Sequence, residues 1–163
     1  MELTVTFEDW KTTVPPEITS DALWRMQLYQ QALFLGEISW FDTTKLMQDQ
    51  RTVRLSDQLY RATGKISTNI AEGYSKASGK DQARFYEYAL GSAREARDWY
   101  YKARHILGEE VALHRIRLTV HLIRQLLTLI PQYRERTLRE EIASYEIYSL
   151  DDLLNTIPMP EDI

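Results

Sequence analysis

Apolar residues recur along four stretches of the chain at alternating steps of three and four positions, the spacing of one face of an α-helix. Each stretch contributes one row of mainly apolar or small residues. The rows are Ala22, Met26, Tyr29, Leu33, Gly36 and Trp40; Leu55, Leu59, Ala62, Ile66, Asn69 and Gly73; Phe85, Ala89, Ser92, Ala96, Trp99, Ala103 and Ile106; and Leu113, Ile116, Val120, Ile123, Leu127 and Ile130. The pattern predicts four long helices rather than strands.

Residues typical of helix ends lie between these rows. Ser78, with Asp81 three positions later, has the spacing of a capping box and predicts the start of the third helix. Glycine after a helical row is typical of a helix C-terminus, and serine or threonine before one is typical of an N-cap. The other expected boundaries are Thr19 or Ser20 for the start of the first helix, Gly73 for the end of the second and Gly108 for the end of the third.

Long helices joined by short connections pack antiparallel, with a left-handed twist when apolar residues repeat every 3.5 positions. The sequence therefore predicts an all-α fold, an up-down antiparallel four-helix bundle over residues 19–138. Residues 1–18, with two adjacent prolines, are expected to form a leader. Residues 139–163 are expected to form an acidic C-terminal appendage with one short helical turn at SLDD.

Two of the predicted helices carry a second apolar row, although a single core requires only one row per helix. Either the leader and the appendage cover these rows, or a second copy of the chain does. Self-association is the preferred interpretation. The additional rows are Trp24, Leu28, Leu35 and Ile38 in the first helix, and Leu118, Leu122, Leu126 and Leu129 in the fourth.

The second and third helices have polar and small residues where bulky apolar ones are expected. Asn69 falls on an apolar row, where a buried amide needs hydrogen-bond partners and can fix register and oligomer number. Glu72 lies in the last turn of its helix, where a negative charge is disfavoured, and we expect it to pair with Arg84. Gly91 lies among small residues and predicts a close approach by another backbone. These residues are interpreted as assembly devices.

Composition narrows the function classes. The 163 residues suit one domain, and the absence of cysteine excludes disulfides, thiolate metal sites and a cysteine nucleophile. With no signal peptide and no apolar run long enough to cross a membrane, a bacterial cytoplasmic protein is expected. Lys/Arg and Asp/Glu number 3 and 8 over residues 1–50, 17 and 9 over 51–139, and 0 and 7 over 140–163. The middle of the chain is basic, and both ends are acidic.

The basic residues of the middle region form stripes on three predicted helices, and phosphate groups are attracted to such surfaces. The candidate nucleic-acid-binding residues are Arg54, Arg61 and Lys65 on the second helix; Arg94, Arg97, Tyr101 and Arg104 on the third; and Arg117 and Arg124 on the fourth. The alternative interpretation is that each stripe is an ordinary solvated face.

Signals for catalysis are weak. The GKIS at 64–67 lacks the first glycine of a phosphate-binding loop, because Leu59 stands at that position. His114 and His121 are seven residues apart and share a helix face, but no carboxylate joins them at the spacing of a metal site. We therefore expect no enzymatic activity, no catalytic residue, no cofactor and no metal.

The stretch RLSDQLYRATGKISTNIAEGYSKASGKDQARFYEYALGSARE at 54–95 resembles the four helix bundle proteins also called 23S rRNA intervening-sequence proteins. The accessory variability determinant of diversity-generating retroelements is in the same family. The resemblance covers about residues 21–135. By position, the family's recurring residues are Asn69, Glu72, Gly73, Arg84, Phe85, Gly91, Ser92 and Glu95, which are expected to be structural or interfacial.

The resemblance implies a homo-oligomer, since known members form five-fold barrels, and it implies no catalytic activity. For the retroelement accessory protein it implies binding to nucleic acid and to a reverse transcriptase through basic surface. The hypothesis is thus an oligomeric adaptor for nucleic acid or a ribonucleoprotein. The alternative is a protein-interaction scaffold without nucleic-acid binding, and the acidic tail either meets a partner or shields the basic faces of its own bundle.

Overall fold

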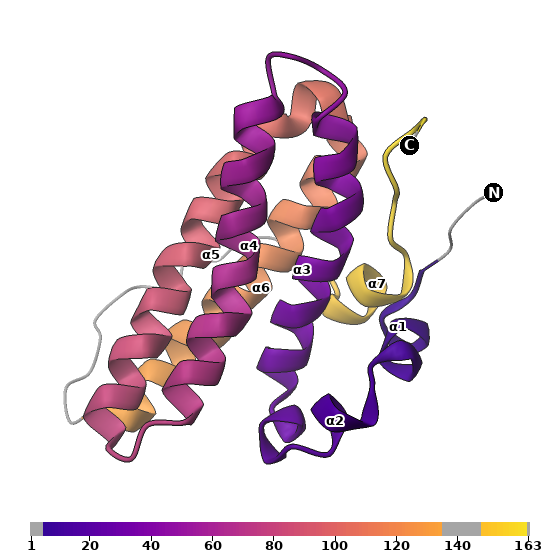
Figure 1. Cartoon of the computed structure of the whole chain (residues 1–163). Coiled ribbons are helices and arrows are strands. Elements are labelled where there is room, and N and C mark those ends of the chain that lie inside the picture. Colours follow the sequence, from indigo (N-terminus) through magenta and orange to yellow (C-terminus); the bar gives the residue numbers. More distant parts are fainter. Residues whose placement is uncertain (1–4, 135–147, 163) are drawn as a thin grey trace.

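The computed structural model describes residues 5–134 and 148–162, and within these ranges every regular element is a helix (Figure 1). The all-helical prediction is confirmed. No helix in the described ranges combines the length and hydropathy needed to cross a membrane. The long helices are α3 (Gln27–Leu46), α4 (Val53–Tyr74), α5 (Gly79–Leu107) and α6 (Glu109–Tyr133), and the short ones are α1 (Phe7–Thr13), α2 (Pro16–Thr19), the 3₁₀-helix η1 (Ala22–Arg25) and α7 (Leu150–Asn155).

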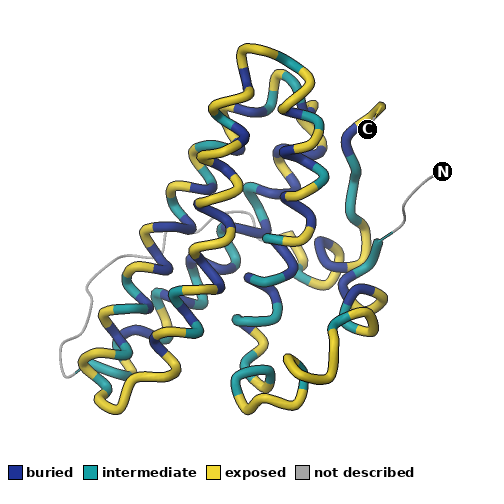
Figure 2. The backbone as a smooth tube through the Cα atoms, viewed as in Figure 1, coloured by how far each residue is buried: buried dark blue, intermediate teal, exposed yellow. Residues whose placement is uncertain are grey.

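The four long helices lie side by side, with α3 and α5 each in contact with both α4 and α6 (Figure 1). Their buried faces point toward one another, while the exposed positions lie on the outside (Figure 2). On α4 and α5 the predicted apolar rows supply part of the buried face, as Leu59, Ile66, Ala89 and Ala96 show. Ile70, Tyr86 and Tyr100 are also fully buried and lie beside these rows. Here the periodicity identified the inward face correctly.

For α3 and α6 the predicted inward faces were largely wrong. None of the six residues of the first predicted row is buried, and Trp40 at its end is 59% exposed. The rows interpreted as additional are the buried ones, because Leu28, Leu35 and Ile38 of α3 lie in the core. Leu118, Leu122 and Leu126 of α6 also lie in the core. These rows therefore give no argument for self-association.

The short helices pack onto the long ones. Phe7 and Trp10 of α1 are buried, and their rings lie 5.3 Å and 5.1 Å from the ring of Phe34 in α3. The Trp10 ring also lies 6.1 Å from the ring of Trp24, so the N-terminal segment covers part of the additional apolar row that begins at Trp24. At the other end of the described chain, α7 contacts both α6 and α1.

Two of the expected helix boundaries are confirmed and two are wrong. The Ser78 hydroxyl accepts a hydrogen bond from the Asp81 backbone N–H at 3.2 Å, which caps α5 as expected. Gly108, at φ 83°, ends α5 and is the single residue before α6. However, α3 begins at Gln27 rather than near Thr19 or Ser20, because the chain first forms α2 and η1.

Gly73 does not end α4 as expected, since the helix continues through Tyr74. Its small size has another reason. A Cβ atom on Gly73 would lie 2.8 Å from Cε1 of Tyr86 and 3.1 Å from Cβ of Phe85, both in α5. Gly73 is buried, and it allows the fully buried Tyr86 ring to pack directly against the α4 backbone.

Candidate interaction surfaces and a buried polar network

Five of the eight recurring family residues line one open groove of about 560 Å³ between α4 and α5. They come from separate helices and from positions up to 26 residues apart, so the fold brings them together. They are Asn69, Glu72, Gly91, Ser92 and Glu95, joined in the groove by Lys65, Thr68, Glu87 and Tyr88.

Two positions in this groove lack, among the described residues, the contacts that the sequence predicts for them. Asn69 is half-buried, and its side-chain amide makes no hydrogen bond in the described ranges, although its burial was expected to require partners. Apart from the neighbouring residues and the backbone of the same helix, no described atom lies within 4 Å of the position that a Cβ on Gly91 would take. Among the described residues the close contact predicted at Gly91 is therefore not made, and both positions are open to contact from outside.

The other three recurring residues lie at the turn between α4 and α5. Gly73 admits the Tyr86 ring, as described above. The Phe85 ring lies 4.6 Å from Lys76 Nζ and 5.6 Å from the guanidinium of Arg84. Within the described chain Arg84 pairs with Asp81 at 3.8 Å and not with Glu72, so the expected clasp across the turn is wrong.

The basic stripe of α5 forms a cluster around an exposed tyrosine. Arg94, Arg97 and Tyr101 line one hollow together with Asp98 and Ile116. Tyr101 is 56% exposed. The guanidinium of Arg104 lies 4.0 Å from the centre of the Tyr101 ring and donates a hydrogen bond to the Tyr101 carbonyl at 2.8 Å. We call Arg94, Arg97, Tyr101 and Arg104 the α5 cluster.

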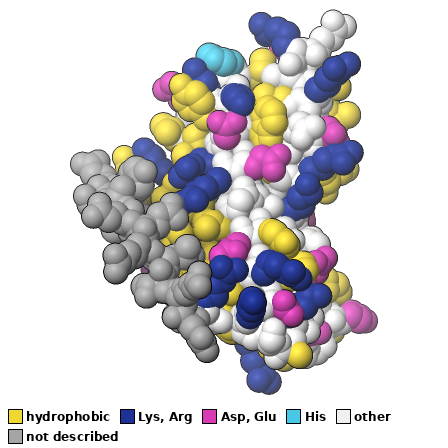
Figure 3. Space-filling model, turned by 90° about the vertical axis from the view of Figure 1, so that its left-hand side faces the viewer, with side chains coloured by type: hydrophobic (Ala, Val, Ile, Leu, Met, Phe, Trp, Pro, Cys, Tyr) yellow, Lys and Arg dark blue, Asp and Glu magenta, His cyan; other side chains and the backbone are white. Residues whose placement is uncertain are grey.

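The remaining basic candidates are distributed over other faces. On α4, Arg54, Arg61 and Lys65 are exposed, and Arg61 pairs with Asp57 at 3.1 Å. On α6, Arg117 lies under the ring of Tyr148, and Arg124 borders a separate hollow between α6 and the start of α3. Figure 3, which faces the side of the molecule where α5 lies in Figure 1, shows Lys and Arg side chains interspersed with Asp and Glu.

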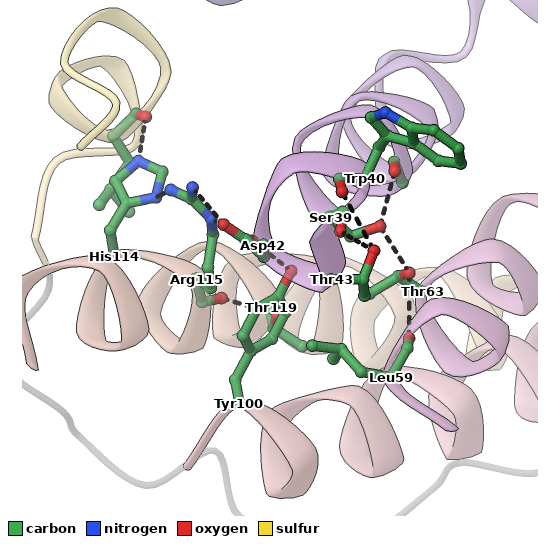
Figure 4. Close-up of polar contacts among 12 residues, drawn as sticks. Ser39, Trp40, Asp42, Thr43, Leu59, Thr63, Tyr100, His114, Arg115 and Thr119 are labelled. Atoms are coloured by element: carbon green, nitrogen blue, oxygen red, sulfur yellow. Dashed lines mark hydrogen bonds and ion pairs between the residues drawn. The ribbon is translucent and has the colours of Figure 1, made fainter. Parts of the chain in front are cut away.

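The interior holds a charged network that the sequence did not reveal. Asp42 of α3 and Arg115 of α6 are both fully buried and form a two-pronged ion pair (Figure 4). Arg115 Nε donates to Asp42 Oδ2 at 2.8 Å, and Nη2 donates to Oδ1 at 2.9 Å. Tyr100 of α5 donates its hydroxyl proton to Asp42 Oδ2 at 2.8 Å. Three long helices thus meet at one carboxylate.

The protonation states in this network follow from its geometry. Burial alone would lower the pKa of Arg115, but the charge and hydrogen bonds of Asp42 outweigh it, so that the pKa of the guanidinium is raised. Burial, followed by the neighbouring Asp42 charge, raises the pKa of Tyr100 well above its usual value. The guanidinium of Arg115 therefore stays charged, and the phenol of Tyr100 stays neutral.

His114 extends the network to α7. Arg115 Nη1 lies 2.9 Å from His114 Nδ1, and a guanidinium can only donate, so Nδ1 is the acceptor. The ring proton is then on Nε2, which donates to the Leu153 carbonyl at 2.6 Å. Burial, with the charge of Arg115 as the next cause, lowers the pKa of His114 to about 4. The imidazole is neutral at pH 7.

The two histidines considered as metal ligands thus have other partners. His121 Nε2 lies 2.9 Å from the Tyr148 carbonyl, so both His114 and His121 bind backbone carbonyls of the C-terminal segment. Within residues 5–134 and 148–162, no three His, Asp or Glu side chains come together in a way that would hold a metal ion.

A comparison with known protein families identifies the helical region. The model of the 23S rRNA-intervening sequence protein family matches residues 25–128. The chain belongs to this family. No curated protein and no solved structure matched it. The family resemblance seen in the sequence is therefore confirmed.

The part of the chain that matches the 23S rRNA-intervening sequence family contains the groove, the α5 cluster and the Asp42–Arg115 pair. It does not include α1 or α7. The contacts that hold the C-terminal segment on α6 consequently join the family region to a segment outside it.

Proposed function

We propose that this 23S rRNA-intervening sequence protein is a non-enzymatic, oligomeric adaptor that binds single-stranded nucleic acid through the α5 cluster. Its subunit is an up-down antiparallel four-helix bundle. The observation that carries the proposal is an exposed tyrosine ring, Tyr101, beside arginines from successive turns of one helix.

The chemistry of the α5 cluster suits a single strand. Aromatic rings and guanidinium planes stack on bases of any sequence, and arginine side chains attract the phosphates between them. Tyr101 supplies the ring, while Arg97 and Arg104 supply charge on either side of it along α5. Around a symmetric oligomer, each subunit would present one such cluster, and the clusters would act together on one strand.

The experiment compares charge-reversed variants by fluorescence anisotropy of labelled RNA and DNA at two salt concentrations. Arg97→Glu/Arg104→Glu should weaken binding and reduce the slope of log affinity against log salt by about 1.4, the loss of two single-strand phosphate contacts. The matched control is Arg51→Glu/Lys80→Glu, which changes the net charge equally at exposed positions outside the cluster. Equal affinity of both variants would overturn the proposal.

We further propose that the groove between α4 and α5 is where copies of the chain meet, in a homopentamer if the family resemblance holds. The unpartnered Asn69 and the open space at Gly91 support this interface. The same observation favours the second candidate function, a protein-interaction scaffold without nucleic-acid binding. A reverse transcriptase is one candidate partner, by the resemblance alone.

Assembly is tested with Gly91→Arg, which places a long side chain in the groove. Light scattering after size exclusion should show a smaller species than the unmodified chain. Gly64→Arg is the matched control, because Gly64 also has open space around it but does not line this groove. If both variants keep the original mass, the groove is not the contact between copies.

A further inference from the structure

The C-terminal segment at 148–155 lies on one face of α6 through specific contacts. His121 and His114 bind the carbonyls of Tyr148 and Leu153 at 2.9 Å and 2.6 Å. The Arg117 guanidinium lies 3.5 Å from the centre of the Tyr148 ring. Leu153 and Leu154 of α7 are buried, which adds an apolar contribution to the same contact.

Arg104 and Arg117 each lie over a tyrosine ring, but the two rings come from different parts of the chain. Arg104 stacks on Tyr101 of its own helix, and both belong to the open α5 cluster. Arg117 stacks on Tyr148, which arrives from a segment 31 positions further along the chain. A nucleobase would stack on a guanidinium plane in the same way as this tyrosine ring. Tyr148 therefore covers a guanidinium plane of the kind on which bases stack.

The C-terminal segment is also acidic, as a segment that competes with nucleic acid would be. Residues 140–163 contain no Lys or Arg and seven Asp or Glu. Asp151 and Asp152 in the first turn of α7 are exposed. These carboxylates add negative charge to the segment that lies against α6, and they repel phosphates.

We propose that the segment at 148–155 is a built-in competitor that occupies a second nucleic-acid contact on α6, centred on Arg117. This inference rests on the proposed function, because it assumes that single-stranded nucleic acid is the ligand. The tyrosine ring takes the place of a base, and the acidic first turn of α7 takes the place of phosphates.

The test uses Tyr148→Ala in the full chain. Tyr148 is 46% exposed, and both histidine contacts are with backbone carbonyls, which the substitution does not remove. Affinity for a labelled single-stranded RNA should rise about fivefold or more, as for one added base stack. The salt slope should steepen by about 0.7. Tyr60→Ala, at another tyrosine with 45% exposure, is the control and should leave affinity unchanged.

Adding Arg117→Ala to Tyr148→Ala should abolish the gain. A gain that survives Arg117→Ala would overturn the inference, as would unchanged affinity of Tyr148→Ala. If Tyr148→Ala has no effect while Arg97→Glu/Arg104→Glu weakens binding, the inference fails and the proposed function stands. If Tyr148→Ala raises affinity while Arg97→Glu/Arg104→Glu leaves it unchanged, the α5 cluster is not the binding site, and the inference about α6 stands. If no variant binds RNA at low salt, both fail.

Discussion

The contact between α3 and α6 and the contact between α4 and α5 are built in opposite ways. The first encloses a fully buried ion pair, Asp42 with Arg115. The second combines small residues with bulky ones, so the helices pack by shape, as Gly73 does against Tyr86. A buried charge depends on having its partner, whereas a small residue depends on the space around it. The two contacts should therefore respond differently to substitution.

The largest effect is expected from Asp42→Ala. The substitution leaves the Arg115 charge buried without its carboxylate, which costs about 3–5 kcal/mol of unfolding free energy. Urea denaturation followed by circular dichroism measures the loss. Asp49→Ala is the control, because Asp49 pairs with Arg51 at 2.6 Å on the surface and should matter little.

A double variant sharpens the same test. Replacing both partners, as Asp42→Leu/Arg115→Met, removes both charges and should be less destabilising than Asp42→Ala alone. A double variant that is as unstable as the single one would mean that the cost lies in packing at this contact rather than in an unpaired charge.

The next effect in size is a dependence of stability on pH at His114. The pKa of His114 is about 4 in the folded protein, against about 6.5 for an ordinary histidine. As pH falls through 6.5 the unfolded chain takes up this proton first, so stability decreases between pH 6.5 and 4, by roughly 3 kcal/mol in total. Arg115 and Arg117 lie nearby and both disfavour the charged imidazole.

The measurement is urea denaturation of the protein and of His114→Gln at several pH values between 7 and 4. Other acidic groups titrate near the lower end, so the difference between the two proteins is the relevant quantity. The variant should lose less stability than the unmodified chain over this interval. Parallel pH profiles would contradict a neutral, buried His114.

The smallest effect belongs to the α4–α5 contact and should depend on the position of the glycine. Gly73→Ala would place a Cβ 2.8 Å from the buried Tyr86 ring and should destabilise the protein by about 1–3 kcal/mol. Gly64→Ala in the same helix meets open space and should stabilise it by up to about 1 kcal/mol. Thermal unfolding distinguishes the two, and changes of the same sign would contradict the close packing at Gly73.

The two contacts also differ in how far the sequence predicts them. On α4 and α5 the inward side could be identified because each helix has one clear apolar or small face, and its residues Leu59, Ile66, Ala89 and Ala96 are buried. On α3 and α6 two rows compete, and periodicity does not say which one faces the core. The N-terminal packing of Trp10 on Phe34, which helps to decide it, is a tertiary contact.

The same limit applies to the sites. Asn69 and Gly91 could be singled out, since an amide and a glycine stand out on an apolar row, and the structure brings both to one groove. Asp42 and Arg115 could not be singled out, because a charged residue in an amphipathic helix usually faces solvent. The two residues are also 73 positions apart in the sequence. Only the fold shows that these two side chains meet.

The turn at Gly108 sets the rotational phase of α6. Because one residue separates α5 from α6, an inserted residue would rotate α6 by about 100° relative to α5. Arg115 would then leave the face that meets Asp42, and His114 would leave α7. The connection at 47–52 between α3 and α4 is longer and can absorb such a change. The length of the Gly108 turn therefore determines which face of α6 points inward.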